Sequence, residues 1–151
     1  MSTVLLATDG SDLATAALVR GLEVIGRDHT FHALSVVPFA IAPAVSPLDG
    51  QPLLVDPMLE GELEQQEKTE SAAELEALND VLEIDAQPLV ELGEPGPTIC
   101  RIAGQLEADV VVLGSHGHGW LQRVLLGSVS RYVIDHAPCP VFVVRLEPTD
   151  D

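Results

Sequence analysis

The chain has 151 residues, of which 46% are hydrophobic and only 3% aromatic, so one domain with a mostly aliphatic core is expected. Its net charge of −17 argues against binding to nucleic-acid backbones or anionic membranes. The two cysteines, Cys100 and Cys139, lack a CxxC spacing and suggest neither a disulfide framework nor a zinc site. No apolar run approaches the roughly 20 residues that span a bilayer, and residues 1–7 lack signal-peptide features. We therefore expect a cytoplasmic protein.

Strand and helix signals alternate in the N-terminal third of the chain. The short apolar run of residues 3–7 predicts a strand, and residues 8–12 supply turn and helix-capping side chains after it. Apolar and small residues then recur with helical spacing over 14–25. A second strand is predicted over residues 31–37.

The middle of the chain begins with a predicted loop. Residues 39–58 hold four prolines and show no helical period. A helix is predicted over 59–82, where the part from Ser71 onward places small and apolar residues on one face and acidic residues outward. A third strand is predicted over residues 85–92.

The C-terminal third repeats the alternation. A proline turn at 93–97 opens a helix, and 109–113 is a continuous apolar run typical of a strand buried on both faces. A helix is predicted from about Ser128, with Val129, Tyr132, Val133 and His136 on one face, and Pro138 stops it. A last strand is predicted over 141–144. Five strands alternating with four helices predict an α/β fold, a mostly parallel sheet with helices on both faces. We expect one domain over 1–147 and a polar tail over 148–151.

The segment 114–128 carries the candidate chemistry. It is rich in glycine and connects a buried strand to a helix. Glycines let the backbone approach a phosphate, and the N–H groups at a helix start point toward it, so the segment suits an anion. Ser128 either caps the helix or donates its hydroxyl to a phosphate oxygen. The segment matches neither the Walker A pattern nor the dinucleotide fingerprint, and on glycine content alone a sharp turn explains it equally well.

The spacing of Gly114, Gly117, Gly127 and Ser128 resembles the G-x2-G-x9-G-[S/T] signature of ATP-binding universal stress proteins. Three further segments resemble landmarks of that family: Val-Leu-Leu-Ala-Thr-Asp-Gly-Ser at 4–11, Gly-Glu-Pro at 93–95 and Ala-Pro-Cys-Pro-Val-Phe-Val-Val at 137–144. The resemblance covers nearly the whole chain and implies a Rossmann-like parallel sheet in the order 3-2-1-4-5. In that order strands 1 and 4 are neighbours where the winding reverses, and ligands of open α/β sheets bind in that crevice.

The resemblance also implies a ligand and the residues that hold it. The implied ligand is an adenine nucleotide, ATP with Mg²⁺, although the sequence does not separate ATP from ADP or AMP. The implied contacts are Val36 to adenine, Ala7, Thr8 and Asp9 to base and ribose, Leu113 and Gly114 beside them, and Gly117, Gly127, Ser128, Val129 and Ser130 to the phosphates. Ala7 departs from the family, where proline is frequent at this position.

Several single residues have two interpretations. Asp9 is a ribose- or metal-associated carboxylate or the cap of the first helix, and the two roles can coexist. His116 and His118 form either half of a metal site, which lacks further ligands nearby, or a packing and hydrogen-bonding pair within the loop. Arg123 either reaches a phosphate or lies in solvent, and Trp120 suggests a packing or interface anchor. No metal site and no catalytic residue is assigned.

The function expected from these residues is nucleotide binding with little or no hydrolysis, in a stress-response or regulatory module. An ATPase needs a group that orients water, metal ligands and cationic stabilisation, and the loop offers amides, hydroxyls and at most one arginine. By resemblance, Ser128 or Ser130 could accept a phosphoryl group, and a homodimer pairs through residues 141–145. Two alternatives stay open. One is a dimeric adaptor without nucleotide; the other is an adenylating ligase or nucleotidyl transferase, whose phosphate motif after the first strand is missing here.

Overall fold

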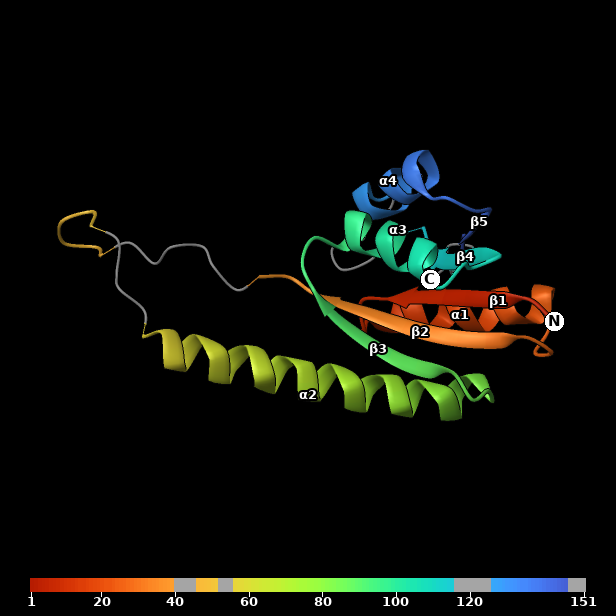
Figure 1. Ribbon diagram of the computed structural model, residues 1–151, viewed down its shortest axis with the longest axis horizontal. Helices are drawn as coiled ribbons and strands as arrows, with labels where there is room; N and C mark the ends of the chain where they lie inside the picture. Colours follow the sequence, from red (N-terminus) through yellow and green to blue (C-terminus); the bar gives the residue numbers. More distant parts are fainter. Residues whose placement is uncertain (40–45, 52–55, 116–125, 147–151) are drawn as a thin grey trace, which may run out of the picture.

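The computed structural model describes residues 1–39, 46–51, 56–115 and 126–146. These residues form a five-stranded sheet in the order β3-β2-β1-β4-β5, with every neighbouring pair parallel (Figure 1). The elements are β1 (Thr3–Thr8), α1 (Asp12–Ile25), β2 (Thr30–Val37), α2 (Pro57–Leu82), β3 (Gln87–Leu92), α3 (Pro95–Gln105), β4 (Val110–Gly114), α4 (Ser128–His136) and β5 (Val141–Val144). The predicted fold class and strand order are confirmed.

The central strand β1 determines how the two cores are divided. It pairs with β2 from Thr3 to Thr8 and with β4 from Val4 to Leu6. Successive side chains of a strand point to opposite faces, so Leu5 and Leu6, both fully buried, enter different cores. Because helices cover both faces, β1 can be apolar along its length instead of alternating with polar residues.

Helices α1 and α2 cover one face of the sheet, and α3 and α4 cover the other (Figure 1). On the first face Leu6 packs with Leu18 and Leu22 of α1 and with Leu75 and Leu82 of α2. The residues of the second core come from α3, α4 and the strands: Leu5, Ala7, Leu34, Ile99, Ile102, Ala103, Ala108, Val111, Leu113 and Val133.

Two glycines lie at close approaches in this packing. A Cβ atom added at Gly96 of α3 would lie 2.8 Å from Cδ1 of Tyr132 in α4. One added at Gly21 of α1 would lie 3.1 Å from methyl groups of both Val112 and Val144. Helix α3 therefore approaches α4 more closely at Gly96 than a side chain would allow, whereas a side chain at Gly21 would need the two valines to shift slightly.

Two predicted boundaries were wrong. The loop expected to reach residue 58 ends earlier, because Asp56 caps α2 by accepting a hydrogen bond from the Met58 amide (2.9 Å) and Pro57 occupies the first helical position. Strand β3 begins two residues later than expected, at Gln87. The Asn79 side chain bonds both the N–H and the C=O of Ala86, which holds the preceding residues in a turn.

The predicted face of α4 is fully buried at Val133, and His136 lies at the surface, which is one of the two positions expected for it. His136 is exposed and stacks on Tyr132, with ring centroids 4.1 Å apart, because it lies in the last turn of a nine-residue helix. Parts of the predicted loop 39–58 and the tail beyond residue 146 lie outside the described residues.

Helix α2 is buried only in its C-terminal half. Its buried residues are Leu75, Leu78 and Leu82, whereas the N-terminal half extends past the sheet (Figure 1). Met58 is 77% exposed. Among the described residues, no helix is long and apolar enough to cross a membrane.

Candidate functional site

The carboxyl ends of β1 and β4 lie side by side at the centre of the sheet. From this edge the chain leaves β1 toward α1 on one face, while β4 precedes α4 on the other face. The strand order therefore reverses between β1 and β4, and such a reversal opens a crevice at the carboxyl edge of an α/β sheet.

The turn after β1 is held by short polar contacts. The Gly10 amide donates to Oγ1 of Thr8 (3.1 Å), and Gly10 has a φ of +79°, a conformation that favours glycine. The Ser11 amide donates to Oδ1 of Asp9 (2.9 Å), and Ser11 in turn caps α1 by accepting a hydrogen bond from the Ala14 amide (3.1 Å). The interpretation of Asp9 as the helix cap is therefore wrong, because Ser11 fills that position and Asp9 braces it.

The start of α4 is tied to the end of β4. The Ser130 hydroxyl donates to the C=O of Gly114 (2.8 Å) and lies 3.3 Å from that of Ser115. The Gly127 amide donates to the C=O of Ser115 (2.8 Å), and the Ser115 amide donates to Val144 at the end of β5 (3.0 Å). The first turn of α4 is thus held at the carboxyl edge of the sheet.

Gly127, and not Ser128, is the N-cap of α4, so the capping role considered for Ser128 is wrong. Gly127 has no side chain with which to cap, and Ser128 is exposed at the first helical position. The first amides of a helix have no acceptor within it, and their positive partial charge favours an anion. This end of α4 offers backbone amides and the Ser128 hydroxyl.

An apolar wall lies beside these polar groups. Ala7 and Leu113 are 6% and 4% exposed and belong to the core on the α3 and α4 side, and Val36 packs against that core from β2. The three residues come from the carboxyl halves of β1, β4 and β2. They make this part of the edge apolar and carry no charge.

The structure thus brings most predicted site residues to one edge of the sheet. These are Ala7, Thr8, Asp9, Val36, Leu113 and Gly114 at strand ends, and Gly127, Ser128, Val129 and Ser130 at the start of α4. Gly117, His116, His118, Trp120 and Arg123 lie outside the described residues. Ser130 is 3% exposed, so its hydroxyl positions α4 and is not presented to the crevice.

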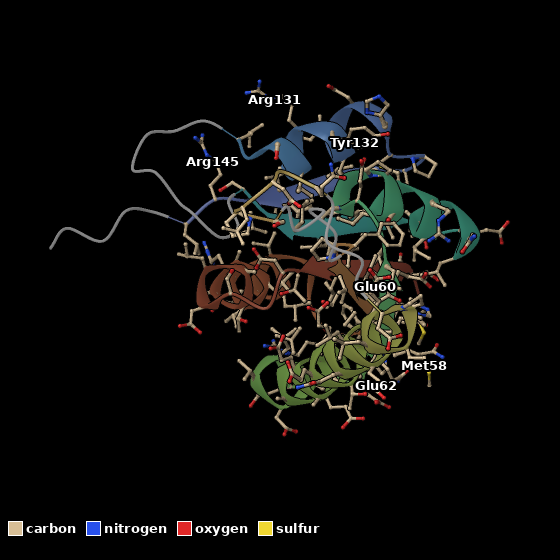
Figure 2. The ribbon with its side chains drawn as sticks, turned by 90° about the vertical axis from the view of Figure 1, so that its left-hand side faces the viewer. Met58, Glu60, Glu62, Arg131, Tyr132 and Arg145 are labelled. Carbon is tan, nitrogen blue, oxygen red and sulfur yellow. The ribbon has the colours of Figure 1, made fainter. Side chains whose placement is uncertain are left out.

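Charge is unevenly distributed around this edge. Arg131 of α4 and Arg145 after β5 are exposed and, among the described residues, form no ion pair. Figure 2 shows them on the α4 side of the molecule, on the opposite side from Glu60 and Glu62 of α2. The described residues contain no group of three or more His, Cys, Asp or Glu that could hold a metal ion.

Comparison with known proteins decides the family. The model of the universal stress protein family matches residues 1–145. The chain belongs to the universal stress protein family. A universal stress protein of Thermus aquaticus is 38% identical over 144 residues, which are 95% of this chain and 98% of that protein. One from Synechocystis is 47% identical over 70 residues, which are 46% of this chain and 62% of the relative.

Solved structures of the family share the fold. UspA from Lactobacillus plantarum is 28% identical, with 95% and 97% of the two chains covered and a TM-score of 0.70. A universal stress protein in complex with cAMP is 22% identical, covers 97% and 98%, and has a TM-score of 0.65. An Arabidopsis thaliana family member with AMP bound is 19% identical, covers 99% and 97%, and has a TM-score of 0.62.

Sequence reasoning missed Ser115 and Glu74. Ser115 connects α4 to β5 through the hydrogen bonds of its backbone C=O and N–H groups. The glycine spacing does not include this residue. Glu74 lies against Gly10, 64 positions away in the chain, because α2 packs beside α1. No local signal predicts that contact.

Proposed function

We propose that this universal stress protein binds an adenine nucleotide, foremost ATP, in the crevice between β1 and β4. The observation that carries the proposal is the start of α4. It has no side-chain cap and is fixed at the carboxyl end of β4 by the Ser130 hydroxyl and the Gly127 amide. A phosphate group is the natural partner of such a helix end.

The rest of the site fits the other parts of a nucleotide. Ala7, Val36 and Leu113 offer an apolar wall for the base, while Thr8 and Asp9 lie at the end of β1 where a ribose would follow. The amides of Ser128, Val129 and Ser130 would hold phosphate oxygens, and Gly117 is included from the sequence pattern.

The solved structures support the class of ligand. Two proteins of this fold hold cAMP and AMP, which shows that the fold accommodates adenine nucleotides. At 22% and 19% identity they carry no residue assignments, so the assignment to this chain rests on its own residues.

Mg²⁺ enters the proposal with the phosphates. It is commonly held by one or two carboxylates together with phosphate oxygens and waters, and Asp9 lies at the end of β1 on this edge. We propose that ATP turnover is slow or absent, because the site consists of amides, hydroxyls and one acidic turn. The proposed role is that of a cytoplasmic regulatory module. Measurement of phosphate release from ATP over hours tests this part.

We further propose a homodimer that pairs through β5. This strand forms one edge of the sheet, and unpaired edges invite association. The C=O groups of Pro140 and Val144 accept hydrogen bonds from β4 and the residue after it. Because backbone groups alternate in direction along a strand, the N–H and C=O groups of Val141 and Val143 point away from β4, toward the open edge. Val143→Pro should abolish the dimer in light scattering while keeping the fold, and a monomeric wild type would contradict the pairing.

The main proposal is tested by releasing bound nucleotide from denatured protein and then titrating stripped protein with ATP by calorimetry, with and without Mg²⁺. Gly127→Ala should weaken ATP binding about tenfold or more, because a Cβ enters the space of the phosphate. Gly104→Ala is the matched control, since its Cβ would meet only Pro138 at 3.8 Å. No binding up to millimolar ATP would rule the proposal out.

A further inference from the structure

A second hollow lies on the other face of the sheet, between the start of α1 and the C-terminal half of α2. Its volume is about 260 Å³. Thr8, Asp12, Thr15, Ser35 and Glu74 supply its polar lining. The apolar wall Ala7, Val36 and Leu113 belongs to the opposite face, so this cavity lies across the sheet from that wall, and the two sites share Thr8.

Ser35 is the most deeply buried polar group of the cavity. The residue is 8% exposed and lines the hollow, and its side chain forms no hydrogen bond with any residue in the described part of the chain. Buried hydroxyls are normally hydrogen-bonded, and leaving one without a partner costs about 1–3 kcal/mol. The Ser35 hydroxyl therefore faces the cavity and is available to a hydrogen-bonding group that enters it.

The cavity is acidic. Glu74 reaches across from α2 so that a Cβ on Gly10 would lie 2.6 Å from its Oε2, and Asp12 lies in the first turn of α1. Within the described ranges, neither carboxylate forms an ion pair, and no lysine or arginine lines the cavity. Both carboxylates are exposed, and in a chain of net charge −17 they make the mouth of the hollow favourable to a cation.

The remaining lining distinguishes an organic cation from a metal ion. Leu75, Leu78 and Val81 form an aliphatic wall along α2. A divalent metal prefers about six oxygen ligands, and the described residues hold no cluster of three or more metal-binding side chains. An aliphatic wall with carboxylates and hydroxyls beside it suits an alkyl chain that ends in an ammonium group.

We propose that this cavity binds a small alkylammonium ion. Asp12 and Glu74 pair with the ammonium group, the Ser35 hydroxyl accepts a hydrogen bond from it, and the leucines of α2 contact the alkyl chain. The volume lies just below the roughly 300 Å³ at which drug-sized pockets begin, so the ligand is metabolite-sized. This site goes beyond the proposed nucleotide function and does not depend on it.

The test is an amide NMR titration of nucleotide-free protein with n-butylamine, which is protonated at pH 7, and with uncharged n-butanol. Butylamine should shift the amides of Gly10, Ser35 and Glu74, and butanol should bind at least about tenfold more weakly. Glu74→Gln should weaken butylamine about three- to fivefold, and Ser35→Ala should also weaken it. Glu76→Gln is the control on the same helix, because Glu76 is exposed and lies outside the cavity lining.

Three outcomes would overturn the proposal. They are no shift at tens of millimolar butylamine, equal binding of butylamine and butanol, and equal losses in Glu74→Gln and Glu76→Gln. Glu74 and Glu76 are exposed, whereas Ser35 is a buried residue of β2, so circular dichroism is used to check that each variant is folded before titration. ATP titration of the same samples is independent, so failure here leaves the nucleotide proposal intact.

Discussion

The two faces of the sheet present opposite chemistry at the same carboxyl edge. On the α4 side, backbone amides at a fixed helix start, apolar strand ends and the exposed Arg131 and Arg145 favour an anion (Figure 2). On the α2 side, Asp12 and Glu74 with buried Ser35 favour a cation. A net charge of −17 therefore does not determine the sign of the ligand at each local site. The charge that each site favours depends on the helix that is packed over that face.

The largest effect is expected where α3 meets α4, because this contact positions the anion side. Gly96→Ala would place a Cβ 2.8 Å from the Tyr132 ring, and overpacking of this kind costs about 1–3 kcal/mol. Urea denaturation measures the loss. Gly104→Ala in the same helix should be neutral or stabilising by up to about 1 kcal/mol, and equal losses in the two variants would contradict the packing account.

Substitutions at Ser130 and Ser128 distinguish the positioning of α4 from the binding of ATP. Ser130→Ala removes the hydroxyl that bonds the Gly114 carbonyl, so stability should fall by about 1–2 kcal/mol and ATP affinity with it. Ser128→Ala, at an exposed position, should lower ATP affinity while stability changes by less than about 0.5 kcal/mol. Urea denaturation and calorimetry on both variants check this, and a reversed pattern would refute it.

Gly10 tests the cavity on the α2 side of the sheet. Gly10→Ala should cost about 1 kcal/mol, because φ is +79° and the new Cβ would collide with the Glu74 carboxylate. Butylamine affinity should also fall as Glu74 moves. Gly50→Ala shares a positive φ but has open space around it, so it should leave butylamine affinity unchanged in the same NMR titration.

The smallest effect is expected at Arg145, which follows β5 and lies beside the anion side. Arg145→Gln should weaken ATP binding about threefold and AMP binding less, since an exposed charge contributes up to ~1 kcal/mol. Calorimetry at two salt concentrations measures both. Arg20→Gln, in an exposed ion pair with Glu23, is the control, and an equal loss there would show a mere net-charge effect.

Periodicity predicted most of the fold because apolar spacing reports burial directly. The run at 109–113 and the face of 14–25 correspond to β4 and α1, and the resemblance supplied the strand order. Boundaries failed where a polar side chain bonds the backbone, as Asn79 does before β3 and Asp56 does before α2. Such bonds depend on geometry that spacing does not encode.

The site was predictable where a motif is continuous and unpredictable where distant segments meet. Gly127 and Ser128 were found through glycine spacing, yet the choice of Gly127 as the cap depends on how α4 approaches β4. The inward turn of the Ser130 hydroxyl and the meeting of Glu74 with Gly10 need tertiary contacts. No single-sequence pattern contains them.

The most direct test of the nucleotide proposal is amide hydrogen exchange of the stripped protein with and without saturating ATP. We predict slower exchange at residues 7–9 and 127–130, and unchanged exchange along α2. Protection confined to α2, or no protection at either segment despite measured binding, would contradict an adenine nucleotide held between β1 and α4.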